Sequence, residues 1–209
     1  MPLIRKGGAE PPAPARDERG EALATLTDGT NDQRWAAARA AGEAPGGVQA
    51  LGQALLTEMD PRVREAIFTS LMRTHSPEAV EAILPHLRSD DANLRTGALD
   101  ALRGLAGTAT PNLPTLLRDP DQDVRVLACE ILRDLPSVEA KPLLCELLGR
   151  DEQVNVCAAA VEVLAEIGGP EALPALVACM ARFPNEPCLI FSIKAAVARI
   201  GAQITAHRG

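Results

Sequence analysis

The chain has 209 residues, of which 46% are hydrophobic and only 2% aromatic, and its 21 basic and 28 acidic residues give a net charge of −7. An acidic chain with so few aromatic side chains is poorly suited to nucleic-acid binding, which needs clustered cations and stacking surfaces. No stretch reaches the roughly 18 apolar residues that span a bilayer, and the N-terminus lacks the apolar core of a secretory signal, so we expect a cytoplasmic protein.

The chain is expected to begin with a disordered arm over residues 1–16, which are rich in Pro and Gly, followed by a single domain over 17–209. In this domain apolar residues recur at helical spacing and nowhere alternate with period two, so we expect six helical pairs and no strands. The first helices of the pairs are expected over 18–27, 46–57, 77–88, 109–118, 137–149 and 170–182. The second helices are expected over 31–42, 61–74, 91–106, 121–134, 152–168 and 187–204.

A unit of about 30 residues recurs through these pairs. In residues 60–64, 90–95 and 119–125, an acidic turn is followed by an apolar residue and then by Arg. One anchor position in each second helix recurs at spacings of 30, 31, 30, 32 and 33 residues, and it is held by Gln33, Val63, Leu94, Val124, Val156 and Leu189. Repetition at this period is typical of a solenoid, in which short helical pairs share one elongated core.

The segment 119–128, with Asp123, Val124 and Arg125 at its centre, resembles a HEAT repeat, and more narrowly the short HEAT-like repeats of the phycobilisome (bilin) lyase type. Residues 159–168 resemble the end of the second helix in the same family. The resemblance extends over about residues 18–204 and implies an all-α, right-handed superhelix of about six HEAT-like hairpins.

The family resemblance also implies a ladder of polar contacts between neighbouring units. The matching basic positions are Arg64, Arg95 and Arg125. The matching acidic positions are Asp60, Asp90, Asp91, Asp119, Asp121 and Asp123, of which Asp90, Asp119 and Asp123 are favoured. The fifth and sixth units carry Cys157 and Ile190 where the ladder would have Arg, so the ladder is expected to change near the C-terminus.

No group of residues has the spacing of a catalytic, metal or cofactor site. His75, His86 and His207 lie far apart, and the sequence contains no Gly-rich phosphate loop. The five cysteines are odd in number and show no CxxC spacing, so we expect them to act as small apolar residues in a reducing compartment. We therefore expect no enzymatic activity, no metal and no cofactor.

The second helices of a HEAT array line its concave side, and offsets of +2, +5, +6 and +9 from the anchor are expected to face outward there. The +5 row contains Phe68, Leu99, Cys129 and Val161, the +6 row contains Asp100, Glu130 and Glu162, and the +9 row contains Met72, Arg103 and Arg133. An apolar row beside an acidic row predicts binding of a helix or peptide with an apolar and a basic face. Alternatively, the acidic residues form solvated pairs with Arg three positions on, and Phe68 and Leu99 belong to the core.

Trp35 and Phe191 occupy offset +2 in the first and last units. Each could anchor a ligand or close one end of the core, because terminal units of a solenoid need capping. The predicted function is a non-enzymatic scaffold or adaptor that binds another protein, with no nucleic acid or membrane partner, while the oligomeric state stays open. The alternative is an enzyme or enzyme subunit resembling a bilin lyase, with Cys129 as the candidate nucleophile on the predicted concave face.

Overall fold

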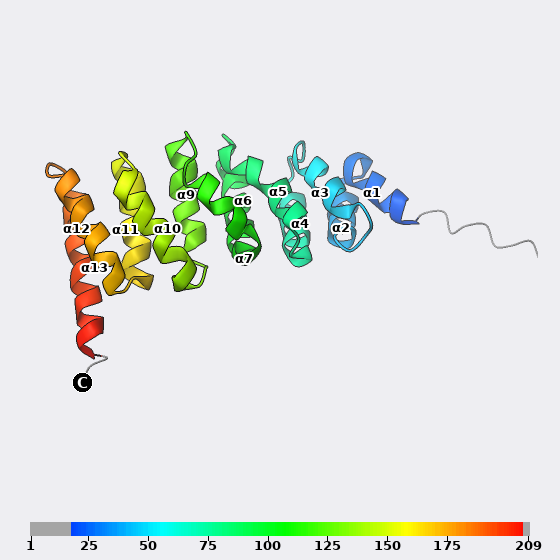
Figure 1. Cartoon of the computed structure of the whole chain (residues 1–209). Helices are drawn as coiled ribbons and strands as arrows, with labels where there is room; N and C mark the ends of the chain where they lie inside the picture. The colour runs from blue at the N-terminus through cyan, green and yellow to red at the C-terminus, as the bar shows by residue number, and fades with distance from the viewer. Residues whose placement is uncertain (1–17, 207–209) are drawn as a thin grey trace, which may run out of the picture.

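The computed structural model describes residues 18–206, and this part of the chain contains helices and no strands. The helices stack in chain order along a line, with α1 at one end and α13 at the other (Figure 1). The predicted all-α solenoid of six helical pairs is confirmed. The expected arm over residues 1–16 lies outside the described residues.

The six pairs form two layers. The first-helix layer contains α1 (Glu18–Asp28), α3 (Gly47–Leu55), α5 (Pro77–Ile83) with η1 (Leu84–Arg88), α7 (Ala106–Ala109) with η2 (Thr110–Asn112) and α8 (Leu113–Leu116), α10 (Ser137–Arg150), and η3 (Pro170–Ala172) with α12 (Leu173–Arg182). The second-helix layer contains α2 (Asn31–Ala41), α4 (Pro61–Thr74), α6 (Ala92–Gly104), α9 (Gln122–Leu132), α11 (Val154–Ile167) and α13 (Pro187–Ala206).

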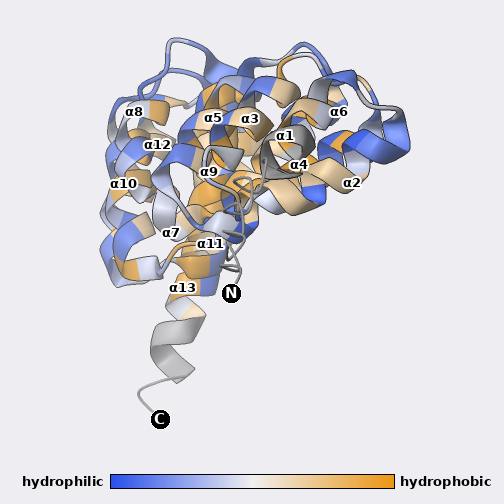
Figure 2. Cartoon of the chain, turned by 90° about the vertical axis from the view of Figure 1, so that its right-hand side faces the viewer, coloured by the Kyte–Doolittle hydropathy of each residue, from blue (hydrophilic) through white to orange (hydrophobic). Residues whose placement is uncertain are grey.

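Each second helix packs against the next one, from α2 through to α13. The first helices pack in the same order, for example α3 against α5 and α10 against α12. Leu and Ala side chains of the two layers form one continuous core, and in the view along the stack the apolar residues lie mainly inside while polar residues occupy the loops (Figure 2). None of the described helices is long and apolar enough to cross a membrane.

Proline divides several first helices that the sequence predicts as continuous. α5 ends at Ile83, and the chain continues as a 3₁₀ helix through Pro85. The helix expected over 109–118 is split by a 3₁₀ turn before Pro114. Proline has no N–H to donate and its ring clashes with the preceding turn, so these segments form short helices in place of one regular helix.

The second helices begin more regularly because side chains cap them. Asp60, Asp91 and Asp121 each accept hydrogen bonds from backbone N–H groups in the first turn, and Thr30 forms a capping box with Gln33. Such caps contribute about 1 kcal/mol each to helix stability. The acidic turns therefore fix where α4, α6 and α9 start.

Candidate functional site

Four successive units repeat the same two hydrogen bonds in the turn before the second helix. In each unit, one side chain accepts a hydrogen bond from the backbone N–H two residues further on. The accepting side chains are those of Glu58, Ser89, Asp119 and Asp151. The backbone carbonyl of the same residue accepts from a side chain six residues further on. The carbonyl bonds come from Arg64 at 2.6 Å, Arg95 at 2.5 Å, Arg125 at 2.8 Å and Cys157 at 3.4 Å. Cys157 thus takes the place of Arg in the fifth unit, where a change in the ladder is predicted.

Carboxylates of the following unit complete the ladder. Arg34 binds Glu58 through two bonds of 2.7 and 3.0 Å, and Arg125 binds Asp151 through two bonds of 2.7 and 3.2 Å. Burial alone would raise the pKa of Glu58, but the Arg34 guanidinium and two backbone N–H groups hold this pKa below its ordinary value. These nearly buried ion pairs join successive units.

The third ladder pair is more open. Arg64 binds Asp91 through one bond of 2.5 Å, and 38% of the Asp91 side chain is exposed. The Arg64 guanidinium lowers the pKa of Asp91. Asp91 is also the N-cap of α6, so it serves both the helix and the ladder.

The favoured acidic positions of the ladder need correction. Asp90 and Asp123 are exposed, whereas the carboxylates that meet arginines lie two residues before the cap or at the cap itself. Asp119 does join the ladder, but its ion pair is with Arg88. No carboxylate meets Arg95 within residues 18–206, and its bond is to the Ser89 carbonyl.

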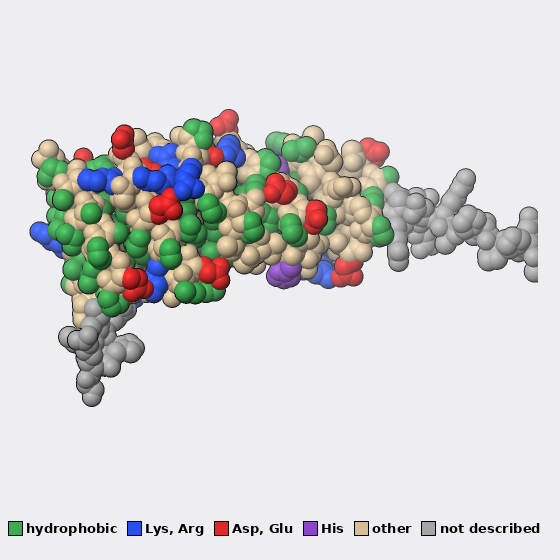
Figure 3. Space-filling view, viewed as in Figure 1, with side chains coloured by type: hydrophobic (Ala, Val, Ile, Leu, Met, Phe, Trp, Pro, Cys, Tyr) green, Lys and Arg blue, Asp and Glu red, His purple; other side chains and the backbone are tan. Residues whose placement is uncertain are grey.

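Lys and Arg gather along one edge of the C-terminal half of the molecule (Figure 3). Arg118, Arg125 and Arg150 line a shallow hollow of about 300 Å³ at the turns between units. Arg118 and Arg125 are ion-paired with carboxylates, and Arg150 donates to the Leu117 carbonyl at 2.7 Å. Because these cations bind groups of the chain itself, the hollow is a structural edge and a poor anion site.

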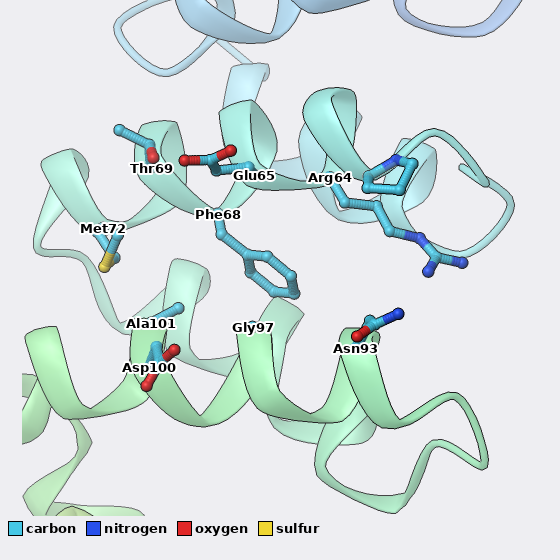
Figure 4. A pocket seen from close by; sticks show the side chains of 10 residues that line it. Arg64, Glu65, Phe68, Thr69, Met72, Asn93, Gly97, Asp100 and Ala101 are labelled. Carbon is cyan, nitrogen blue, oxygen red and sulfur yellow. The ribbon is translucent and has the colours of Figure 1, made fainter.

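A second hollow, of about 480 Å³, lies between α4 and α6 on the second-helix surface. Phe68 and Met72 of α4 face Gly97 and Ala101 of α6 across it (Figure 4). A Cβ atom on Gly97 would lie 2.6 Å from Cε2 of Phe68, so only glycine lets the Phe68 ring approach the α6 backbone this closely. The floor of the hollow is therefore apolar.

Two carboxylates stand on opposite walls of this hollow. Glu65 projects from α4 and Asp100 from α6, and both are exposed (Figure 4). Neither forms an ion pair with another described residue. Arg64, the cation that also lines the hollow, is bound to the Glu58 carbonyl and to Asp91. An apolar floor between two unneutralised carboxylates suits a ligand that is both apolar and cationic.

The hollow brings together three of the predicted binding residues, Phe68, Met72 and Asp100. The predicted apolar row as a whole is wrong. Cys129 and Val161 are 0% and 1% exposed, and Phe68 is 5% exposed, with its ring bordering the hollow from within. The reason is that offset +5 faces the next second helix, as the contact between Phe68 and Gly97 demonstrates, so these side chains pack between units. Leu99 is half-buried against the same core.

The predicted charged residues of the later units are mostly paired. Arg103 binds Asp134, which lies just after α9 in the next unit, at 2.6 Å. Its i,i+3 spacing had suggested Asp100 as the partner. Arg133 binds Glu166 and also Glu130 at 3.3 Å, which is one of the anticipated i,i+3 pairs. Glu130 is thus neutralised and half-buried, so it cannot serve as the free acidic contact that was predicted. Glu162, in contrast, is exposed.

The two terminal aromatic residues differ. Trp35 is half-buried against the core, and the Arg39 guanidinium lies 4.7 Å from the centre of its ring. Trp35 thus helps to close the first unit. Phe191 on α13 is 74% exposed, so the expectation that it closes the other end of the core is wrong.

The repeated turns and the two-layer stack agree with the comparison against known families. Residues 20–103 and 109–188 match the family described as HEAT repeats. The chain belongs to the HEAT-repeat family. No curated protein matches the sequence.

Solved structures of similar fold are distant in sequence from this HEAT-repeat chain. Cex1p gives a TM-score of 0.50 at 13% identity, over 83% of this chain and 40% of the Cex1p chain. The complex of CpcE and CpcF of phycocyanin lyase from Nostoc sp. PCC7120 gives 0.39 at 17% identity, over 96% and 99%. A designed armadillo repeat protein gives 0.41 at 18% identity, over 86% and 98%. At such identities these likenesses concern the fold alone.

Cys129, the candidate nucleophile of the lyase alternative, is fully buried in this HEAT array. Burial raises the pKa of its thiol to about 12, so the thiol is protonated near neutral pH. A buried, protonated thiol can neither reach nor attack a substrate, and the predicted accessible position of Cys129 is wrong. Among the described residues no group of His, Cys, Asp and Glu could hold a metal ion.

Glu65 and Gly97 are the site residues that sequence reasoning missed. Glu65 occupies offset +2, the position that holds Trp35 and Phe191 in the terminal units, so completing that row would have found it. Gly97 lies inside α6, where glycine costs about 1 kcal/mol relative to alanine. A glycine in a helix interior signals a close approach by a neighbouring group.

Proposed function

We propose that this HEAT-repeat protein is a non-enzymatic scaffold that binds a helix or peptide of a partner protein on its second-helix surface. The observation that carries this proposal is the hollow between α4 and α6, with its apolar floor and the two unpaired carboxylates of Glu65 and Asp100. A groove between neighbouring helices is a common seat for an amphipathic helix.

In this binding mode a bulky apolar side chain of the partner enters the hollow and contacts Phe68 and Met72. Burying a side chain the size of leucine contributes about 1.5–3 kcal/mol. A lysine or arginine beside it on the partner then reaches Glu65 or Asp100. The net charge of −7 further favours the approach of a basic partner.

We place the protein in the cytoplasm as part of this proposal. Its five cysteines are free thiols, and three of them are buried in the repeat core. Free thiols persist most readily in a reducing compartment, which supports this location.

A pull-down from native lysate tests the function. The charge-reversed variant Glu65→Lys/Asp100→Lys is compared with the unaltered protein, and bound proteins are identified by mass spectrometry. We expect the variant to lose at least one partner that presents a basic, apolar segment. The matched control is Glu78→Lys/Glu139→Lys, which makes the same change in net charge at two exposed residues of first helices. Equal recovery of every partner by both variants would refute the proposal.

A further inference from the structure

The last unit of the stack presents an outer face that no described unit covers. In the interior of the array, offsets +5 and +9 of a second helix point to the following unit. A Cβ atom on Gly97 would lie 2.6 Å from the Phe68 ring, and one on Gly104 would lie 2.9 Å from the Met72 sulfur. The equivalent residues of α13 are Lys194 and Ala198, and both are exposed. α13 stands at the end of the stack (Figure 1).

The first-helix layer ends in the same way. Cys145 of α10 shares a hollow of about 380 Å³ with Glu171 at the start of the next unit, so this side of α10 faces forward along the stack. The equivalent residue of α12 is Val177, which is 51% exposed. Both helices of the last unit therefore expose the side that interior units use for packing.

This end face is mainly apolar. Phe191 is 74% exposed, and with Val177 it is one of five large hydrophobic residues that are exposed in the described chain. Ala195 and Ala198 lie four and seven residues after Phe191, so the three side chains share one stripe of α13. An exposed apolar surface of this kind indicates an interaction site.

We propose that the end face formed by Val177, Phe191, Lys194, Ala195 and Ala198 binds a helix of a partner protein, and that acidic residues flank the apolar seam of this helix. The partner helix takes the place that the next second helix would occupy. The small side chains of Ala195 and Ala198 permit a close approach, at the interaxial distance of about 8–10 Å that is usual for packed helices. This site is separate from the hollow between α4 and α6 and does not depend on it.

Lys194 decides the chemistry of the occupant. It stands at the +5 position, where interior units have Phe68, Leu99, Cys129 and Val161. A two-fold contact between two copies of the chain places the same patch on both sides, so each face would bring its own lysine to the interface. Like charges at an interface oppose association, whereas a carboxylate of a different partner would neutralise Lys194. The face therefore fits an acidic helix better than a second copy.

Two synthetic amphipathic peptides of about 20 residues, long enough to be helical, test this inference. Both carry the same Leu and Ala seam, and the residues beside the seam are Glu in one peptide and Lys in the other. Their affinities for the full chain are measured by fluorescence anisotropy of a label on the peptide. The variants are Phe191→Ser and Lys194→Glu, and the control is Val138→Ser, which removes an equally exposed apolar residue (74%) from α10.

We expect the Glu-flanked peptide to bind at least tenfold more tightly than the Lys-flanked one. Phe191→Ser should weaken its binding about tenfold, Lys194→Glu should reverse the preference, and Val138→Ser should change neither. Equal affinity for the two peptides, no binding of the Glu-flanked peptide, or unchanged binding by Phe191→Ser would overturn the proposal. A dimer that sedimentation detects without peptide, and that Phe191→Ser converts to monomer, would assign the face to a second copy and also overturn it.

Discussion

The α4–α6 and α9–α11 junctions occupy equivalent places in the stack, yet one is open and the other is closed. At α9–α11 the small side chains of Cys129 and Ala159 are both buried. At α4–α6 the equivalent residues are Phe68 and Gly97, and a hollow of about 480 Å³ opens beside them. One large residue opposite one glycine thus borders a hollow, whereas the two small residues at the equivalent positions are both buried. The same repeat can therefore serve either as a purely structural junction or as a binding junction.

The ladder ion pair is also more exposed, and has fewer hydrogen bonds, at the α4–α6 junction than at the α9–α11 junction. Arg125 makes two bonds to Asp151, whose side chain is only 3% exposed. Arg64 makes one bond to Asp91, whose side chain is 38% exposed. Water can thus replace a lost cation at Asp91 but not at Asp151.

The largest expected effect comes from removing a ladder arginine. Arg125→Leu should lower the free energy of unfolding by about 3 kcal/mol, because Asp151 stays buried without its cation. Arg64→Leu should cost less, about 2 kcal/mol, because the Glu58 carbonyl loses its donor but the more exposed Asp91 can turn to water. Urea denaturation measures both values. A second substitution, Asp151→Leu, should restore much of the stability lost in Arg125→Leu, and equal losses for the two single variants would contradict the contrast between the junctions.

Filling the open junction should separate binding from stability. Gly97→Ala gains up to about 1 kcal/mol of helix propensity, but the new Cβ pushes the Phe68 ring into the hollow. We expect the free energy of unfolding to change by less than about 1 kcal/mol. Recovery of the partner protein that binds the second-helix surface should fall about tenfold. Gly149→Ala is the control, because a Cβ there meets nothing within 4 Å. Full recovery of the partner by Gly97→Ala would show that the hollow is not used.

The stability of the array should also depend on pH through His86, which lies in η1 of the first-helix layer. His86 is 6% exposed, its Nε2 has no hydrogen-bond partner among the described residues, and burial together with the charge of Arg64 lowers its pKa. His86 therefore binds a proton less readily in the native state than in the unfolded chain, where its pKa is about 6.5. The free energy of unfolding should fall as the pH drops from 7 towards 5.5.

Paired denaturation curves check this dependence on pH. His86→Leu should reduce the fall in the free energy of unfolding between pH 7 and 5.5. His75→Asn is the control variant, because His75 is exposed and Asn tolerates its left-handed backbone, with φ of 47°. A profile that His86→Leu leaves unchanged would exclude His86 as its source.

The smallest effect concerns the reactivity of Cys129 at the closed α9–α11 junction compared with that of Cys188 on α13. Cys188 is exposed, so it should react first with an aromatic disulfide reagent, whereas Cys129 should react only after unfolding. Cys188→Ser should remove the fast phase of the reaction. If Cys129→Ser removed the fast phase instead, the closed junction would have to open in solution, and an accessible nucleophile would return to consideration.

The sequence predicts the architecture well because the repeat makes each local signal appear several times. The acidic turns before α4, α6 and α9 share one spacing, so their caps and second helices could be placed from any one of them. The first helices were predicted less well. Pro85 and Pro114 interrupt them, and whether a proline kinks a helix or divides it depends on how the neighbouring units pack.

The candidate site could be predicted only in part, because its opening depends on rotation about the helix axis. Asp100 was correctly assigned to an exposed row, whereas Met72 is half-buried between α4 and α6 and Cys129 and Val161 are fully buried. A rotation of one position moves a side chain by about 100° around a helix, which separates solvent from core. The periodicity of alanine-rich helices does not fix this angle, since small residues are found equally on both faces.

The repeated turn also determines how such a chain can be lengthened. A duplicated stretch that starts at Ser89 and stops before Asp119 contains both the turn acceptor and Arg95, which donates to it. Such a copy would keep the two hydrogen bonds of the turn together. A copy that starts within the helix would separate these groups. The turn therefore marks the natural breakpoint for recombination, and arrays of this kind can gain or lose whole modules while every splice point keeps its bonds.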